Sequence, residues 1–460
     1  MMPGRGGTGL PPRAQGSRAV KADVAHEGTR TEGNQGGAVS HEVMIRAGSL
    51  KLVFTGDLQL DRIASRVPER TPRELLRATT AWTRVVGCAL AEHASLVIVV
   101  GSLAVRSEAA WHLVGPLERG IRRLASAGIP TVFVAGPRDR QLLDCLEREL
   151  PDGHARRLGD GGDARLVVVQ GDAPALVLEA GRTTRDTSSV ELMLGVPDPG
   201  QPALPAELAP VSAATGVGRP LVRAGGAGTA PQLELLSDDA WCLDPGSPQA
   251  FSPADTGVHG PWISELVDGV FAAPEQRPLS TAGYTQLEVD LTGCVTGSAC
   301  RERVQESLHA AAAAFLGRAG PDCRSLSLDV RLTGTTPVSH ELRRHTASLR
   351  HDASRAVGDV PYVVDTLSIE TLPPLDLTST ATSSSTPGAL ARLLLELEGG
   401  ELSELSEDVQ QLVRSTRRLL QERARHHPPT RGTSPEVTEA EVVTHLRLRA
   451  RALLSQLVTS

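Results

Sequence analysis

The chain has 460 residues, of which 40% are hydrophobic and 22% are charged, a composition typical of a soluble globular protein with more than one domain. Its formal net charge of −7 argues against broad nonspecific attraction to nucleic acid, although a local basic face stays open. No stretch approaches the roughly 18 apolar residues of a membrane span, and six cysteines without a C-x-x-C pair favour a reduced, cytoplasmic location.

Residues 1–48 form a first segment that is rich in glycine, arginine and polar residues. They lack the apolar run of a secretion signal, so we predict a disordered extension. Met44 offers an alternative start just before the first strand. A basic arm that touches nucleic acid is a second interpretation, weakened by the acidic residues that follow its cations, which are Arg5, Arg13, Arg18 and Lys21.

Three segments, at 52–61, 96–102 and 129–139, each combine a short apolar run with a glycine turn. Such continuous runs are typical of buried parallel strands. Helical patterns separate them, and the first helix is predicted to begin at Thr71-Pro72. The result is a β-α-β-α-β series whose turns meet at the carboxyl edge of one sheet, where open α/β folds bind ligands.

Two tryptophans belong to the helical patterns between these strands. We interpret Trp82 and Trp111 as core or helix-packing residues. The alternative, a base-stacking role, would require exposure beside a basic groove.

Beyond residue 139 the pattern predicts a helix over 142–150 and short strands over 166–169, 175–178 and 190–194. These strands would form the second sheet of a two-layer sandwich with flanking helices. From 197 to 228 Pro, Gly and Ala accumulate without periodicity, which predicts long loops.

The three turns resemble motifs of calcineurin-type metallophosphoesterases. Gly56-Asp57-Leu58-Gln59 is similar to D-x-H, Gly101-Ser102 to G-D, and Gly136-Pro137-Arg138-Asp139 to G-N-H-D. Later stretches resemble one branch of that family, the SbcD/YhaO-like DNA-repair exonucleases. They are 241–249 and 255–257, similar to its post-catalytic strand and loop, and 330–337 and 370–377, similar to its capping domain.

This resemblance implies an α/β fold in which a two-layer metallophosphoesterase-like β-sandwich flanked by helices precedes an α+β capping domain and C-terminal helices. The implied parts are a sandwich domain at 49–283, a capping domain at 284–377, a linker at 378–388 and a helical partner-binding region at 389–460. Within the capping domain, alternation predicts strands at 286–291, 325–333 and 363–371, and helices at 302–316 and 340–355.

The resemblance also implies a site for two divalent ions, held by carboxylates, imidazoles and an amide, which generate hydroxide and neutralise phosphate. Most of these ligands are replaced. Gln59 stands for an imidazole, Ser102 for the bridging carboxylate and Pro137 for the amide. The positions of the degenerate site are Asp57, Gln59, Ser102, Pro137, Arg138, Asp139, Gly226 and Gly228.

Arg138 stands where the family places a histidine beside the leaving group. Arginine stays protonated and cannot exchange a proton at neutral pH. We predict that Arg138 lies in or beside the metal space and pairs with Asp57, whose buried charge would otherwise be uncompensated. No cofactor is therefore expected. A rebuilt site for Mn²⁺ or Mg²⁺ would use Asp57, Asp198 and Asp139.

Three other patterns favour ordinary structure over chemistry. Ser102 lacks the G-x-S-x-G elbow of a serine hydrolase, and residues 225–228 lack the Lys-Ser/Thr end of a phosphate loop. His340, His345 and His351 are spaced by five and six residues, which does not place them on one helical face.

Apolar residues at helical spacing return after the linker. In the resembled family a helical pair at this place grips the coiled coil of a partner ATPase, and helices that fold back on their own domain are the alternative. The stripe predicted to bind consists of Leu393, Leu394, Leu397, Leu412, Val413, Leu419 and Leu420.

Two functions of different class follow. The first is a catalytically inactive, nuclease-like subunit of a DNA-repair or chromosome-maintenance complex, with an SbcC/YhaN-like coiled-coil ATPase and DNA as partners and no membrane contact. The second is an active metal-dependent DNA exonuclease or phosphodiesterase with a rebuilt site. Metal content distinguishes them, while the sequence leaves open a homodimer, the DNA structure bound and the true start codon.

Overall fold

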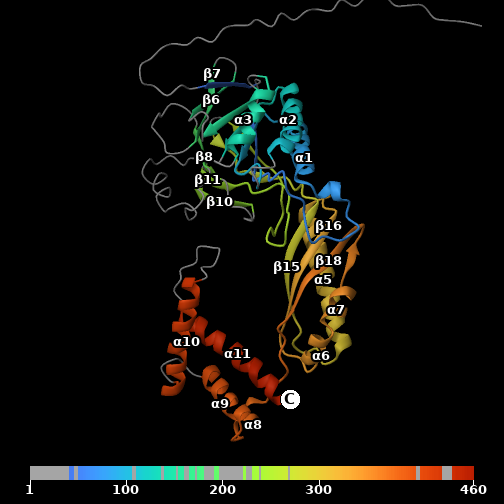
Figure 1. Ribbon diagram of the computed structural model, residues 1–460, viewed down its shortest axis with the longest axis vertical. Coiled ribbons are helices and arrows are strands. Elements are labelled where there is room, and N and C mark those ends of the chain that lie inside the picture. The colour runs from blue at the N-terminus through green and yellow to red at the C-terminus, as the bar shows by residue number, and fades with distance from the viewer. Residues whose placement is uncertain are drawn as a thin grey trace, which may run out of the picture. The chain divides into compact units, whose positions relative to one another are not determined.

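The structure is a computed structural model in which strands and helices alternate from β2 (Leu50–Gly56) to β5 (Ala155–Gly159), a run of strands follows, and helices end the chain (Figure 1). The described residues are 41–45, 50–105, 110–135, 139–151, 154–159, 165–170, 173–180, 191–195, 221–223, 231–237, 240–267, 270–399, 405–426 and 438–459. Their strands form two seven-stranded sheets and one four-stranded sheet, accompanied by helices. The fold is therefore mixed α/β, as predicted.

The first sheet contains the three strands predicted before the glycine turns. Its order is β13-β12-β2-β3-β4-β5, in which β2 to β5 run parallel and β12 pairs antiparallel with β2 and β14. The bounds are β2 (Leu50–Gly56), β3 (Leu96–Val100), β4 (Thr131–Ala135), β5 (Ala155–Gly159), β12 (Trp262–Val267), β13 (Val270–Phe271) and β14 (Glu275–Gln276). All five residues of β3 are buried, because both faces of this sheet are covered.

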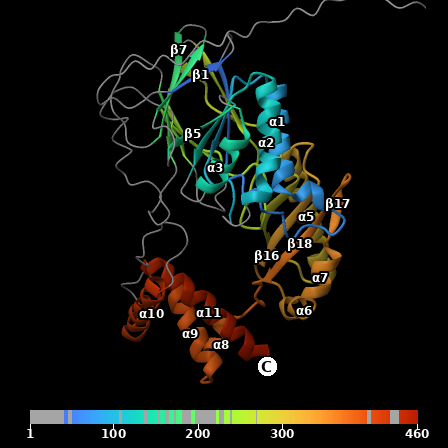
Figure 2. The same cartoon turned by 45° about the horizontal axis from the view of Figure 1, so that its top comes forward.

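Three helices cover one face of the first sheet (Figure 2). They are α1 (Ala78–Ala91), α2 (Ala110–Ser126) and α3 (Arg140–Glu149). Trp82 of α1, Leu117 of α2 and Phe133 of β4 belong to the hydrophobic core between these helices and the sheet. Each helix follows a parallel strand and returns antiparallel to it, so the helices begin at the carboxyl edge of the sheet.

The start of α1 differs from the prediction of a helix from Thr71-Pro72. A 3₁₀ turn, η1 (Arg73–Leu76), comes first. Arg77 then takes an extended conformation, with φ −78° and ψ 139°, so the α-helix begins only at Ala78.

The second sheet packs face to face on the other side of the first. Its order is β1-β6-β7-β8-β9-β11-β10. The bounds are β1 (His41–Ile45), β6 (Arg165–Gln170), β7 (Ala173–Ala180), β8 (Glu191–Gly195), β9 (Leu221–Arg223), β10 (Gln232–Ser237) and β11 (Ala240–Asp244). Phe54 of β2 and Trp241 of β11 meet edge to face in the shared core, with ring centroids 5.9 Å apart.

β1 lies inside the segment 1–48 that was expected to be disordered. It pairs in parallel with β6, from His41 opposite Leu166 to Ile45 opposite Gln170. Residues 1–48 are polar on average, and this average composition hides the short apolar run near the end of the segment. Residues 1–40 lie outside the described residues.

The third sheet has the order β15-β16-β18-β17. Its strands are β15 (Ala282–Asp290), β16 (Ser325–Thr333), β17 (Arg355–Val357) and β18 (Val360–Ile369). The helices α5 (Gly297–Ala319), α6 (Ser339–Arg344) and α7 (Thr346–Asp352) share one core with it. The single helix expected over 340–355 is wrong: His345, with φ −109° and ψ 20°, separates α6 from α7, and Arg355 begins β17.

Three contacts join the third sheet to the loop between β2 and α1. The Tyr284 hydroxyl donates to the carbonyl oxygen of Ser65. Arg66 forms an ion pair with Asp365 at 3.0 Å. The hydroxyl of Thr281 donates to the carbonyl oxygen of Leu75 at 2.7 Å.

The C-terminal helices are α8 (Leu377–Ala381), α9 (Thr386–Gly399), α10 (Glu407–His426) and α11 (Glu439–Thr459). The expected linker at 378–388 is thus helical at both ends. α9, α10 and α11 share a core that contains Leu397, Val413 and Val442. None of the helices in the described part of the chain combines the length and apolarity needed to cross a membrane.

This packing corrects the predicted partner-binding stripe. Leu394, Leu397 and Val413 are buried among the helices themselves, and Leu393 and Leu420 pack against their core. Leu412 and Leu419 keep 37% and 65% of their surface exposed. The α10 stripe is therefore half covered by its own module, which was the alternative left open by the sequence.

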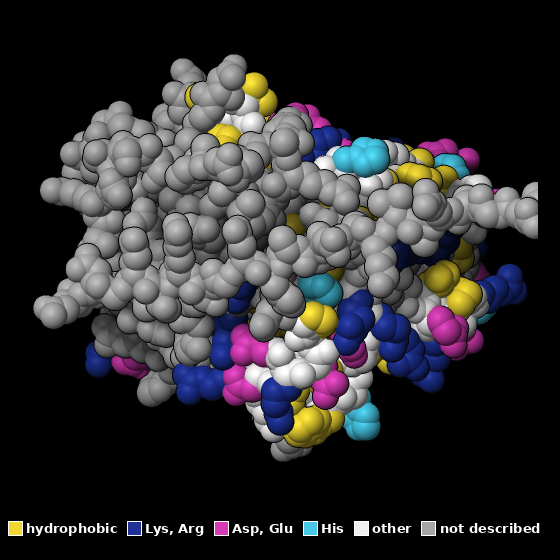
Figure 3. Space-filling view, turned by 90° about the horizontal axis from the view of Figure 1, so that it is seen from above, with side chains coloured by type: hydrophobic (Ala, Val, Ile, Leu, Met, Phe, Trp, Pro, Cys, Tyr) yellow, Lys and Arg dark blue, Asp and Glu magenta, His cyan; other side chains and the backbone are white. Residues whose placement is uncertain are grey.

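Basic and acidic side chains both occur on the described part of the face shown in Figure 3. The described part of this face thus carries both signs of charge, in a chain whose net charge is −7. Any binding of a polyanion would therefore depend on local groups of residues.

Candidate functional site

The loops that follow β2, β3 and β4 meet at one edge of the first sheet. These strands are parallel and in register, with Gly56 opposite Val100 and Val100 opposite Val134. The backbone N–H of Asp57 donates to the carbonyl oxygen of Val100 at 3.0 Å, and that of Gln59 to Ser102 at 3.2 Å. The fold thus places Asp57, Gln59 and Ser102 at one edge of the sheet.

Asp57 is a buried carboxylate at this edge, with 5% of its surface exposed. Its Oδ1 accepts a hydrogen bond from the backbone N–H of Ser102 at 3.0 Å. Burial raises the pKa of Asp57 from its usual 3.8 to about 7, and the nearby carboxylates of Asp244 and Asp139 raise it further against the opposing effect of the Ser102 bond. Near neutral pH a large share of the Asp57 side chains is therefore protonated.

Two more buried aspartates lie close enough to Asp57 to affect its pKa. Asp139 is 1% exposed, and its Oδ1 accepts from the backbone N–H of Leu103 at 2.8 Å. Asp244 is 5% exposed and ends β11, where its Oδ1 accepts from the N–H of Gly246 at 3.1 Å. Sequence reasoning quoted the stretch around Asp244 but gave it no role. The available signal was an aspartate at the end of a strand, directly before a Pro-Gly turn.

Gln59 carries the main change relative to the resembled site. Its side chain is 2% exposed, and its backbone has φ +44°, a value that non-glycine residues seldom adopt. Nη1 of Arg62 donates to Oε1 of Gln59 at 2.6 Å. The guanidinium also lies over the Phe251 ring, 4.7 Å from its centroid. A cation therefore contacts the residue that stands for a metal-binding imidazole.

Arg62 was missed by the sequence analysis, which assigned this role to Arg138. It lies three residues after Gln59, outside any of the resembled motifs. Arg138 lies outside the described residues, as do Pro137, Asp198, Gly226 and Gly228. The placement of Arg138 beside Asp57 stays a prediction.

The side-chain oxygens described at this edge do not fit the ligand set of a dinuclear metal centre. The Gln59 amide oxygen accepts from Arg62, and one oxygen each of Asp57 and Asp139 accepts from a backbone N–H. Within the described ranges, no group of three or more His, Cys, Asp or Glu side chains has a metal-binding arrangement. That statement includes the exposed His340, His345 and His351, which lie on or between two separate helices.

The loop after β11 holds the Phe251 ring beneath Arg62. Oδ2 of Asp255 accepts from the backbone N–H of Phe251 and of Ser252, each at 3.0 Å. His259 is 2% exposed, and its ring nitrogens lie 2.9 Å from the Ser247 carbonyl oxygen and 3.2 Å from that of Asp255. Burial lowers the pKa of His259, so the ring is neutral and its one N–H donates to one of these two carbonyl oxygens.

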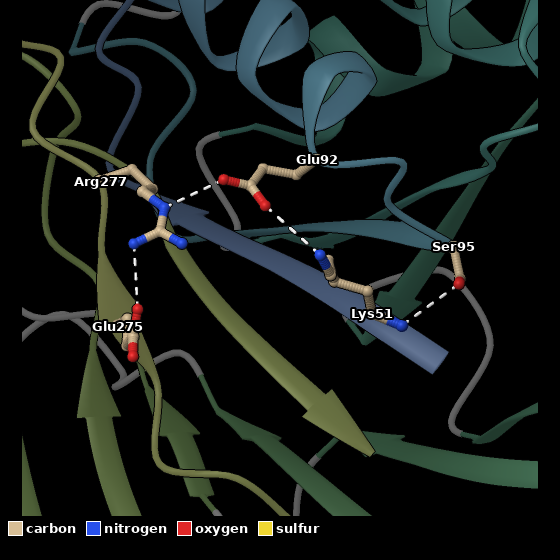
Figure 4. A network of polar contacts seen from close by, with 5 residues as sticks. All are labelled: Lys51, Glu92, Ser95, Glu275 and Arg277. Atoms are coloured by element: carbon tan, nitrogen blue, oxygen red, sulfur yellow. Dashed lines mark hydrogen bonds and ion pairs between the residues drawn. The ribbon is translucent and has the colours of Figure 1, made fainter. Parts of the chain in front are cut away.

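The opposite edge of the same sheet carries a separate polar network (Figure 4). Lys51 Nζ donates to Glu92 at 3.3 Å, and Nε of Arg277 donates to the other Glu92 oxygen at 3.0 Å. Arg277 also bonds Glu275 at 3.0 Å, and the N–H of Lys51 bonds the Ser95 hydroxyl at 3.2 Å. Hydrogen bonding from Arg277 lowers the pKa of Glu92, in line with its paired state. This network fixes the amino ends of β2 and β3 and lies away from the site.

Comparison with known proteins gives one family match. Residues 284–372, which contain the third sheet, match the family model described as the middle domain of the metallophosphoesterase YhaO. No curated protein matches the chain. Among 47 matching chains of solved structures, one crystal structure aligns with 50% of this chain and 99% of its own length, at 11% identity and a TM-score of 0.30, too low to carry an argument. The match relates residues 284–372 to the middle domain of that metallophosphoesterase.

Proposed function

We propose that this chain is a nuclease-like subunit of a cytoplasmic DNA-repair or chromosome-maintenance complex, and that its phosphoesterase site is catalytically inactive. In this proposal the two packed sheets, apart from β1, form the metallophosphoesterase sandwich at 49–283. The third sheet belongs to the capping domain at 284–377, and residues 389–460 are the partner-binding region. The middle-domain match supports the family relation. The bond between Arg62 and Gln59 carries the argument for lost catalysis.

Metal-assisted hydrolysis of a phosphodiester needs ligands that hold cations and place a hydroxide against phosphorus. The side-chain oxygen of Gln59, the atom that could bind a metal, already accepts a hydrogen bond from the Arg62 guanidinium at 2.6 Å. A divalent ion at the same oxygen would be repelled by that fixed positive charge. Ser102, in the place of the bridging carboxylate, has a hydroxyl that does not ionise at neutral pH. In this proposal Gln59 binds a cation of the chain itself, at a position where the resembled family binds a metal.

Metal content and activity test the proposal together. The full chain is equilibrated with Mn²⁺, freed of loosely held metal, and analysed for bound ions before a phosphodiester assay. We expect less than one tightly bound ion per chain and no hydrolysis above a metal-only control. Two tightly bound ions, or an activity that disappears in Asp57→Ala, would replace this proposal by the second candidate.

The second candidate is an active metal-dependent exonuclease or phosphodiesterase with a rebuilt site. One observation favours it: Asp57, Asp139 and Asp244 lie close enough to raise the pKa of Asp57, and a bound cation would relieve that repulsion. Its ligands would then include Asp57 and Asp139, with Asp198 from outside the described residues. The Mn²⁺ experiment decides between the two candidates.

We place the ATPase contact on the uncovered half of the α10 stripe. Leu412 and Leu419 are exposed and seven residues apart, which is the repeat by which helices join a coiled coil. Their neighbours Val409 and Val413 are engaged inside the helical module. The resembled family uses a helical pair in this part of the chain for an SbcC/YhaN-like ATPase, which supports this choice of partner.

Substitution of the two leucines tests the contact. Leu412→Asp combined with Leu419→Asp should abolish co-purification with a co-expressed coiled-coil ATPase, while the thermal melt of the chain changes little because both residues are exposed. Leu448→Asp is the matched control, since Leu448 is 59% exposed on α11. Retained association in the double variant would place the contact elsewhere.

A further inference from the structure

The four tryptophans of the chain differ sharply in exposure. Trp82, Trp241 and Trp262 are 0%, 2% and 8% exposed, whereas Trp111 is 63% exposed. An exposed indole leaves a large apolar ring in water, and tryptophan is highly buried on average. The interpretation of Trp82 as a core residue is confirmed, but the same interpretation of Trp111 is wrong.

Trp111 lies at the edge of the sheet that carries the candidate site. It is the second residue of α2, and α2 begins at the carboxyl edge beside α1, against which it packs. Two more exposed apolar side chains belong to loops of this edge, Ile63 at 44% and Val105 at 45%. The N–H of Val105 donates to Oδ1 of Asp61 at 2.8 Å, which holds the two loops together.

The loop that carries Ile63 is rich in arginine. Residues 61–77 contain five arginines and three acidic residues, which gives a local charge of +2 in a chain whose net charge is −7. Arg70, Arg73 and Arg77 are exposed, and Arg77 pairs with Ile63 in a short β-bridge. Arginine side chains bind phosphate oxygens through paired N–H donors. The edge therefore combines one exposed indole, two exposed aliphatic side chains and several arginine side chains that can bind phosphate oxygens.

We propose that Trp111 is a stacking platform for an unpaired base of single-stranded DNA, whose phosphates contact the arginines of residues 61–77. This inference rests on the DNA-binding part of the proposed function and names the form of DNA that the edge accepts. A flat, exposed indole binds any base, whereas the bases of an intact duplex are stacked on one another and not available. The arginines complement the phosphates that such a strand presents.

Intrinsic fluorescence isolates this contact, because the other three tryptophans are buried. Addition of an oligothymidine to the full chain should quench the emission of Trp111, and a blunt hairpin duplex should quench it much less. An oligonucleotide of the same length with abasic sugars keeps the phosphates and should bind without quenching. Equal quenching by the abasic strand would overturn base stacking.

Anisotropy of a labelled oligothymidine then separates the possible failures. Trp111→Ala should weaken binding by roughly tenfold or more, and Trp111→Phe, which keeps an aromatic face, should stay near wild type. Because Trp111 is exposed, both variants should melt like the wild type. Unchanged affinity of Trp111→Ala would overturn this inference and leave the proposed function standing. No binding of any DNA by the wild type would overturn both.

Discussion

At the amino ends of β2 and β3, Lys51, Glu92 and Arg277 alternate in sign, each bonded to a neighbour and partly exposed to water. At the carboxyl ends of the same strands, Asp57 is buried near two further carboxylates, Asp139 and Asp244. The ion pairs of Glu92 add little to the free energy of unfolding, because they are partly exposed to water. The second destabilises the fold wherever Asp57 is ionised, because a buried negative charge beside others of its sign is unfavourable.

The carboxyl edge of the sheet therefore carries an unfavourable electrostatic free energy that the packing of the fold does not require. A sequence selected only for stability would place an apolar residue or an amide at position 57. Instead, three aspartates lie close enough for Asp139 and Asp244 to raise the pKa of Asp57, and Arg62 donates to the neighbouring Gln59. Three substitutions test this difference between the two edges.

The largest effect is expected from Asp57→Asn. The pKa of Asp57 is raised in the folded state from 3.8 to about 7, so the folded chain binds more protons than the unfolded chain, and stability is lost as pH rises between these values. The asparagine variant removes this loss and should be more stable at pH 8, by at most about 4 kcal/mol. Urea unfolding at pH 5 and pH 8, with EDTA present, measures it. A less stable variant at pH 8 would indicate that the ionised carboxylate is needed.

A smaller effect is expected from Arg62→Ala. The substitution leaves the buried oxygen of Gln59 without its donor and removes the cation from the Phe251 ring. Loss of roughly 1–3 kcal/mol of unfolding free energy should follow. Arg70→Ala is the control, as an exposed arginine of the same loop. Equal effects of the two variants would mean that the bond to Gln59 contributes nothing.

The smallest effect is expected at the opposite edge. Lys51→Ala removes one of two cations from Glu92, in a pair whose side chains are 27% and 26% exposed. Exposed pairs contribute less than about 1 kcal/mol and weaken with salt. Unfolding in low and high salt should therefore show a difference that shrinks as salt is added. A loss larger than that of Arg62→Ala would reverse the ranking of the two edges.

The order of strands and helices could be read from the sequence because it depends on local patterns. Short apolar runs before glycine turns marked β2, β3 and β4, and β6, β7 and β8 were found within a few residues. β5 was not expected, and β9 lies in the stretch 197–228 that was predicted to form loops. Breaks set by single backbone conformations were missed, such as those at Arg77 and His345, since many residues adopt such conformations without a sequence signal. β1 was missed because its short apolar run ends a segment that is polar as a whole.

The site was predictable as an edge and not as a set of contacts. Parallel strands bring Asp57, Gln59 and Ser102 together by topology alone. The pairing of Gln59 with Arg62 depends on the turn after β2, in which Asp57 and Gln59 both have positive φ. The exposure of Trp111 was also beyond sequence reasoning, because a helical pattern does not reveal which of its faces a neighbour covers.

The pairing of Lys51 has a practical consequence for chemical labelling. The chain has only two lysines, Lys21 and Lys51, and Lys51 is the only one among the described residues. Its amine is bonded to Glu92 and reacts with an acylating reagent only when that bond opens. The acylation rate of Lys51, followed by mass spectrometry, therefore reports how often the ion pair between Lys51 and Glu92 opens.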